Sequence, residues 1–174
     1  MFNERYSVHI HGTVNAVYTT KANAHIQYQI VSRPPWKSVY GNTAGKTALG
    51  KRQSSQQFGH RCIIAHQFQL QLVKEQANPL GWPQIVFEAY EMSFAGKDKL
   101  IGYGILRVPL FNSREIIKVP IFYPTVAGDG VGAITGIQPE LNDPKLLAQS
   151  TSRGHISTKS TGEWIEVLLD TVVV

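Results

Sequence analysis

Short segments of strictly alternating apolar and polar residues constrain the fold of this chain more than any other feature. The alternation is clearest in residues 8–13, 25–30 and 67–72. Successive side chains of an extended strand point to opposite faces, so this pattern places one face on a core and the other toward water. These segments therefore predict half-buried β-strands.

Longer and nearly continuous apolar runs occur later in the chain. They cover residues 85–90, 100–110, 116–123 and 164–174. Strands that are covered on both faces have this composition. Turn signals separate the runs, namely Asn78-Pro79-Leu80-Gly81, Ala95-Gly96-Lys97-Asp98 and Asn112-Ser113. The spacing predicts an all-β fold of roughly seven to nine short strands, arranged as a sandwich or a barrel.

The length of 174 residues is typical of a single domain, here residues 1–174, and is enough to bury a core. One short helix is expected after Asp143, an N-cap residue that is followed by Pro144 and good helix formers. Two long connections are predicted, at about residues 32–57 and 125–142. The single cysteine, Cys62, excludes an intramolecular disulfide and is interpreted as a buried small hydrophobe.

The formal net charge of +5 favours acidic partners such as nucleic acid, anionic lipid or an acidic protein face. Nucleic acid is not an expected partner, because no strand combines basic and aromatic residues as RNA-binding sheets do. No run approaches the roughly 18 apolar residues of a spanning helix. The first residues match neither a signal peptide nor a myristoylation signal, so a soluble cytosolic domain is expected.

Motifs for catalysis or cofactor binding are incomplete. Residues 41–47 resemble a phosphate-binding loop, but three residues separate the glycines where that loop needs four. His9 and His11 share a strand face and could begin a metal site, yet no third ligand lies nearby, so a polar outward face is the plainer interpretation. Neither a nucleophile elbow nor a pair of carboxylates is recognisable. We therefore expect no enzyme activity, no cofactor and no metal.

The first long connection is basic. Its cations are Arg33, Lys37, Lys46, Lys51 and Arg52, and residues 32–57 contain no acid. With Trp36 and Tyr40, these cations could contact an anionic membrane surface, because cations attract it at long range and an aromatic ring suits the headgroup level. A solvated loop with incidental charge explains the same composition, and both interpretations stay open here.

A series of motifs resembles the core signature of the B9-domain family. The signature consists of Gly81-Trp82-Pro83-Gln84-Ile85-Val86, Gly102-Tyr103-Gly104 and Val108-Pro109. Residues 121–124 and 143–149 also fit, so the resemblance runs from about residue 78 to residue 149 and into the last strand. It implies a C2-like antiparallel β-sandwich of about eight strands with one short helix.

The resemblance also implies a function. Members of this family act on the cytoplasmic side of the ciliary transition zone, near the basal body, in the Meckel-syndrome complex. The expected partners are other B9-domain proteins, with which the chain would build the ciliary gate and support ciliogenesis. The alternative is a calcium-independent module that binds anionic lipid. Calcium itself is not expected, because it needs about six to eight oxygen ligands and residues 92–99 supply only Asp98.

The signature residues themselves are interpreted as structural. Gly81 permits a positive φ, Trp82 covers one end of the core, and Pro83 suits the start of a strand because it cannot donate to a ladder. Gly102 and Gly104 would leave room for a ring from a facing strand, such as Trp82 or Phe87. Tyr103 and Pro109 are also interpreted as structural signature residues.

Overall fold

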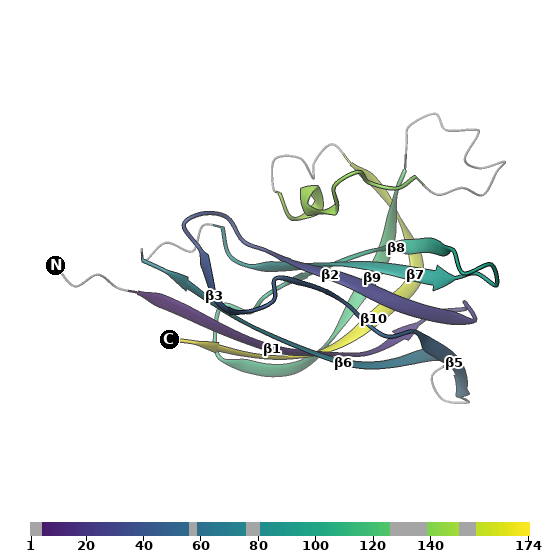
Figure 1. The fold of residues 1–174 in the computed structure, drawn as a ribbon, viewed down its shortest axis with the longest axis horizontal. Coiled ribbons are helices and arrows are strands. Elements are labelled where there is room, and N and C mark those ends of the chain that lie inside the picture. The colour runs from purple at the N-terminus through teal and green to yellow at the C-terminus, as the bar shows by residue number, and fades with distance from the viewer. Residues whose placement is uncertain (1–4, 56–58, 76–80, 126–138, 150–155) are drawn as a thin grey trace.

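The structure, a computed structural model, describes residues 5–55, 59–75, 81–125, 139–149 and 156–174 (Figure 1). These residues form strands almost throughout, with one short 3₁₀ helix. The elements are β1 (Tyr6–Tyr18), β2 (Asn23–Val31), β3 (Lys37–Gly41), β4 (Ala44–Lys46), β5 (Gly50–Ser55), β6 (Gly59–Lys74), β7 (Gln84–Met92), β8 (Asp98–Arg107), β9 (Ser113–Thr125), η1 (Pro144–Ala148) and β10 (Ser157–Val173).

The strands form two antiparallel layers. The first layer joins β6, β1, β10 and β9 through long ladders, with β3 and β5 on the far edge of β6. The second layer consists of β4, β2, β7 and β8. Among the described residues, the layers meet where pairing is short: β2 pairs β5 at two positions, and β8 pairs β9 through Tyr103 and Phe122. The result is a β-sandwich closed like a flattened barrel, which confirms the predicted fold class.

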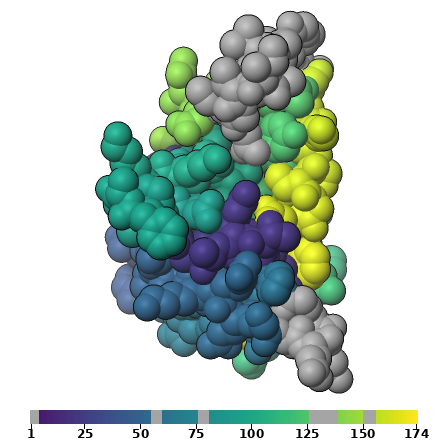
Figure 2. All heavy atoms as spheres, turned by 90° about the vertical axis from the view of Figure 1, so that its right-hand side faces the viewer, coloured from purple at the N-terminus to yellow at the C-terminus, as the bar shows by residue number. Residues whose placement is uncertain are grey.

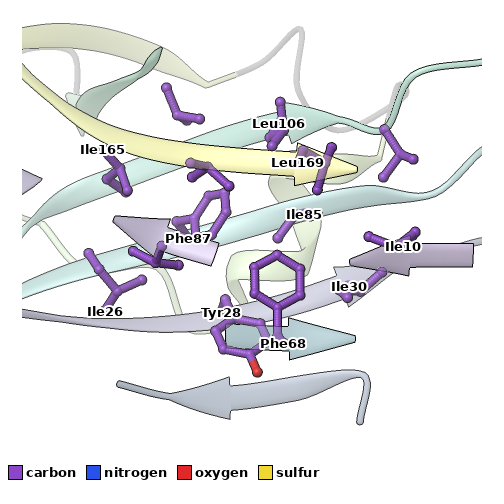
Figure 3. Close-up of a cluster of buried hydrophobic side chains, with 14 of the residues drawn as sticks. Ile10, Ile26, Tyr28, Ile30, Phe68, Ile85, Phe87, Leu106, Ile165 and Leu169 are labelled. Atoms are coloured by element: carbon purple, nitrogen blue, oxygen red, sulfur yellow. The ribbon is translucent and has the colours of Figure 1, made fainter. Parts of the chain in front are cut away.

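The main core lies between the layers, where the alternating strands turn their apolar residues inward. Ile10, Ile26, Phe87 and Ile165 are completely buried. Figure 3 shows these side chains converging from opposite strands, with the Tyr28 and Phe68 rings side by side at a centroid distance of 5.0 Å. The period-two pattern in β1, β2 and β6 therefore selected the core face correctly.

A second, smaller core covers the outer face of β7 and β8. Val86 and Tyr103 point away from the main core and pack with Leu147 of η1, and each is only 1% exposed. The Tyr103 hydroxyl accepts a hydrogen bond from the backbone N–H of Leu141 at 2.9 Å. Both faces of β7 and β8 are thus covered, as their continuous apolar runs predicted. The same prediction was wrong for β9 and β10, whose outer faces are largely not covered and where Ile116 is 62% exposed.

The short helix lies where it was predicted. It spans Pro144–Ala148 and is a 3₁₀ helix, and the Asp143 side chain caps it by accepting from the Lys145 N–H at 3.0 Å. The second predicted connection lies mostly outside the described residues, which resume at residue 139.

The prediction of one long connection at residues 32–57 was wrong. This segment contains β3, β4 and β5, so the described residues hold more strands than the expected eight or so. All five residues of β3 are exposed, so no contact with a core requires apolar residues at alternate positions there. Backbone pairing with β6 and β2 makes these segments strands, and such edge pairing leaves no apolar pattern in the sequence.

Candidate interaction surfaces

The signature residues Gly81, Trp82 and Pro83 form a corner at the start of β7. Gly81 has a φ of +75°, and its carbonyl accepts from the Arg33 N–H at 3.2 Å. The Trp82 indole donates to the Val108 carbonyl at 2.8 Å and meets Trp36 edge-on at a centroid distance of 5.3 Å. The corner therefore ties the start of β7 to the end of β8 and covers one end of the main core.

The glycines of β8 allow β9 to approach closely. A Cβ atom at Gly102 would lie 2.6 Å from the Phe122 carbonyl oxygen, and one at Gly104 would lie 2.9 Å from Cγ1 of Val119. The space is thus filled by the backbone and aliphatic side chains of β9, and not by the aromatic ring that we expected. Tyr103 faces the second core, and Pro109 is half-buried just after β8. All of these contacts are internal to the domain.

The five cations of residues 32–57 do not form one patch. β3, which carries Lys37, pairs the end of β6 near Val73, whereas Arg52 of β5 pairs Cys62. These positions are roughly 30 Å apart along the strand. Arg33 lies before β3, and Lys51 lies beside Arg52, while Lys46 forms an ion pair with Asp98 at 3.2 Å. The predicted lipid contact through all five cations stays a prediction, but one flat surface cannot meet them together.

Asp98 is neutralised within the domain. Its Oδ2 atom lies 3.2 Å from Lys46 Nζ and 3.4 Å from Nε2 of His25. His25 is only 1% exposed and stacks on Tyr90. Burial lowers the pKa of His25 below its ordinary value; the Asp98 carboxylate opposes this shift and the Lys46 ammonium adds to it. The lone acid of residues 92–99 thus belongs to an internal charge cluster.

The buried imidazole predicts a loss of stability in acid. As the pH falls through about 6.5, His25 in the unfolded chain takes up a proton while buried His25 stays neutral, so the unfolded state is favoured. Replacing His25 by glutamine is expected to flatten the decline in melting temperature between about pH 7.5 and pH 5.5. The exposed His11→Gln variant should keep the wild-type slope. An unchanged slope in His25→Gln would refute the assignment.

The residues that resembled catalytic or cofactor motifs lie in strands or in the core of the domain, or are exposed without neighbouring ligands. Residues 41–47 run from the end of β3 through β4, and the buried Thr47 hydroxyl accepts from the Ile26 N–H at 3.0 Å. Cys62 is fully buried, and burial raises its pKa to about 11. His11 is exposed on β1, and the described residues contain no group of three metal-ligating side chains. No helix in the described part of the chain is long and apolar enough to cross a membrane.

The outer face of the first layer is broad and open. Residues that pair across antiparallel strands share a face, so the ladders align Ile116, Leu168, Thr13 and Gln67 in one row. The next row holds Arg114, Asp170, His11 and Gln69. We call these two rows the outer sheet face. A groove of about 1120 Å³ is bordered by the residues of these rows other than Ile116 and, on its other side, by residues of β3 and β4 such as Tyr40 and Lys46. Ile116 is 62% exposed.

Comparison with known families identifies the chain. A family model described as "Ciliary basal body-associated, B9 protein" matches residues 8–172. The chain belongs to the B9 family. The match begins well before residue 78, so the family extends over β1 to β6, where few signature motifs were recognised. It confirms the family that the Gly81-Trp82-Pro83 and Gly102-Tyr103-Gly104 motifs indicated.

Several curated relatives support this B9 assignment. The chain is 28% identical to B9 domain-containing protein 1 of Drosophila melanogaster over 79% of its length, which is 59% of that relative. It is 27% identical to the Xenopus laevis protein of the same name, covering 79% of this chain and 69% of the relative. The human protein of that name is 30% identical over 71% of this chain and 64% of the relative. The chain thus spans between 59% and 69% of these relatives.

Among solved structures, a C2 domain of plant extended synaptotagmin 1 aligns with this B9 domain at a TM-score of 0.46 and 11% identity, covering 94% of this chain and 93% of that one.

Sequence reasoning missed two surfaces of the B9 domain. For the outer sheet face, the sequence indicated only that the polar positions of the alternating strands point outward. The register that aligns these positions on neighbouring strands is set by the tertiary structure. The second surface lies at the turn between β7 and β8, where Phe94 is completely exposed. The turn signal at residues 95–98 was recognised, but nothing local shows that the preceding ring points into solvent.

Proposed function

We propose that this B9 domain is a non-enzymatic structural component of the ciliary transition zone. In this role it binds other B9-domain proteins on the cytoplasmic side, near the basal body, and helps to build the ciliary gate. Two findings support the proposal: membership of a family described as basal body-associated, and a broad exposed sheet face suited to a protein partner.

The outer sheet face carries this proposal. Its centre is apolar, with the exposed Ile116 beside the half-buried Leu168. Around them lie uncharged Thr13 and Gln67, and the nearby charges of Arg114 and Asp170 face each other across a ladder. Protein interfaces have this composition, because charge is depleted at their centre and polar groups form the rim. Long ladders also hold the backbone of the face rigid, so little backbone freedom is lost on binding.

Charges placed at the centre of the face test the proposal. The double variant Ile116→Asp, Leu168→Asp is expected to weaken binding to a second, purified B9-domain protein at least about tenfold, because buried unpaired carboxylates are strongly unfavourable. Isothermal titration measures the affinity, and a melting curve checks the fold. The matched control is Phe111→Asp, in the turn between β8 and β9, where the ring is 68% exposed. Equal affinities of the double variant and the control would contradict this binding face.

A further inference from the structure

An ordered turn between β7 and β8 holds an aromatic ring in water. Phe94, near the apex, has a relative exposure of 111%, the largest among the described large apolar side chains. The Ser93 N–H donates to the Lys97 carbonyl and the Gly96 N–H to the Ser93 carbonyl, both at 2.9 Å. The Ser93 hydroxyl also accepts from the Lys97 N–H at 3.2 Å. The ring is therefore projected by a defined turn rather than by a loose loop.

The base of this turn is fixed to the neighbouring strand. The Asn23 side chain at the start of β2 accepts from the Met92 N–H at 2.8 Å and donates to the Met92 carbonyl at 3.0 Å. Asn23 also pairs with Lys51 of β5. The turn, the start of β2 and β5 are thus parts of one rigid end of the sandwich.

Basic side chains surround the exposed ring at this end. Lys97 and Lys99 lie on the β7–β8 hairpin, Lys21 lies in the β1–β2 turn, and Lys51 and Arg52 lie on β5. Except for the half-buried Lys21, these side chains are exposed. Figure 2 looks at this end of the molecule and shows the hairpin, the β1–β2 turn and β5 gathered on one surface. We call Phe94 with these five cations the basic tip.

Two of the acids near the basic tip, Asp98 and Glu163, have polar contacts within the domain. Asp98 pairs with Lys46, and Glu91 lies opposite Lys99 in the β7–β8 ladder. Glu163 accepts from the Thr19 hydroxyl at 2.7 Å and from the Thr20 N–H at 3.1 Å. A hollow of about 480 Å³, lined by Lys21, Lys99 and Lys159 as well as Glu91 and Glu163, opens beside the tip. Cations therefore dominate the outer part of this surface.

We propose that the basic tip docks on an anionic membrane, with Phe94 inserted at the boundary between headgroups and acyl chains and the lysines against lipid phosphates. An isolated convex ring suits a fluid surface that deforms around it, whereas a protein partner would need a matching pocket. An apolar ring and several cations supply the two contributions that hold a protein on a membrane surface. The tip shares no residue with the outer sheet face, so this proposal is independent of the proposed assembly.

Vesicle binding tests the docking. The wild-type domain is expected to sediment with vesicles of phosphatidylcholine and phosphatidylserine, to lose binding when salt is raised from about 0.1 M to about 0.5 M, and not to bind phosphatidylcholine alone. Phe94→Ala should weaken binding about tenfold. Lys97→Gln with Lys99→Gln should weaken it roughly 25-fold, at about fivefold per lysine. The controls Phe111→Ala and Lys118→Gln, exposed away from the tip, should stay within about twofold of wild type.

A fluorescent label tests the insertion. Phe94→Cys can be labelled with an environment-sensitive dye, because the native Cys62 is buried and its pKa is raised to about 11. Anionic vesicles should shift the emission of this label to the blue, and a label at Phe111→Cys should not shift. Equal binding to neutral vesicles, an unshifted Phe94→Cys label, or wild-type binding by Phe94→Ala would each overturn the proposal. Binding to polyglutamate but not to vesicles would assign the tip to an acidic protein and would also overturn it.

Discussion

Replacing Gly102 by alanine is expected to lower the free energy of unfolding by about 3 kcal/mol, because overpacking against an immobile neighbour has costs of this order. The added Cβ would lie 2.6 Å from the Phe122 carbonyl oxygen and 2.7 Å from Cγ2 of Ile121. The first of these atoms is backbone, so relief requires β9 to move. That movement would break the Tyr103–Phe122 pair, which is the described ladder contact between β8 and β9.

Denaturation with urea, followed by circular dichroism, measures this effect. Gly96→Ala is the matched control, because Gly96 also has a positive φ, of +72°, but a Cβ there would meet nothing within 4 Å. We expect it to cost only about 1 kcal/mol, the penalty of the left-handed conformation. If Gly102→Ala were no more destabilised than Gly96→Ala, the close approach of β9 would not be what requires glycine.

Replacing Trp82 by alanine is expected to destabilise the domain by about 3–5 kcal/mol, as truncation of a large packed ring usually does. The variant loses the edge-on contact with Trp36 and the hydrogen bond to the Val108 carbonyl. Both contacts close one end of the main core, so the loss opens that end to water. Trp82→Phe should recover part of the packing but not the hydrogen bond, and is therefore expected to be intermediate.

The Trp82 variant also separates a structural role from a binding role. Because every contact of the ring that we describe is internal, binding to a second B9-domain protein should fall only in proportion to the unfolded fraction. Urea denaturation gives that fraction, and titration with the partner gives the affinity of the folded remainder. A Trp82→Ala domain that stays fully folded but no longer binds its partner would show that the signature is a contact surface.

Most strands could be predicted from local sequence, since alternation depends only on which residues face the core. This holds for β1, β2 and β6, whose inward residues Ile10, Ile26 and Leu70 are almost fully buried. β7 and β8 were also predicted correctly as covered on both faces, although the covering elements were not identified. Asp143 and Pro144 predicted the short helix because capping is a contact between residues two or three positions apart.

The segment from β3 to β5 could not be predicted in this way. Its residues are strands because β6 is 16 residues long and offers one edge to β5 near Cys62 and to β3 near Leu70. Those bonds join backbone groups and leave the side chains exposed, so composition carries no signal of them. The same pairing separates Lys37 from Lys51, which is why cations close in sequence do not form one basic surface.

The strand class and the turn at Gly81 follow from local sequence, because alternation and a positive φ depend on neighbours within a few positions. The family follows from motifs that can be read along the sequence, whereas the contacts of the Gly81 corner with Arg33, Trp36 and Val108 are tertiary. The two candidate surfaces follow only from the tertiary structure. Ladder registers bring Ile116 beside Leu168 and Lys51 beside Asn23, and side-chain hydrogen bonds fix Asn23 to the base of the turn that exposes Phe94. Such contacts join residues distant in sequence, and their registers are decided by the packing of the whole sandwich rather than by any local pattern.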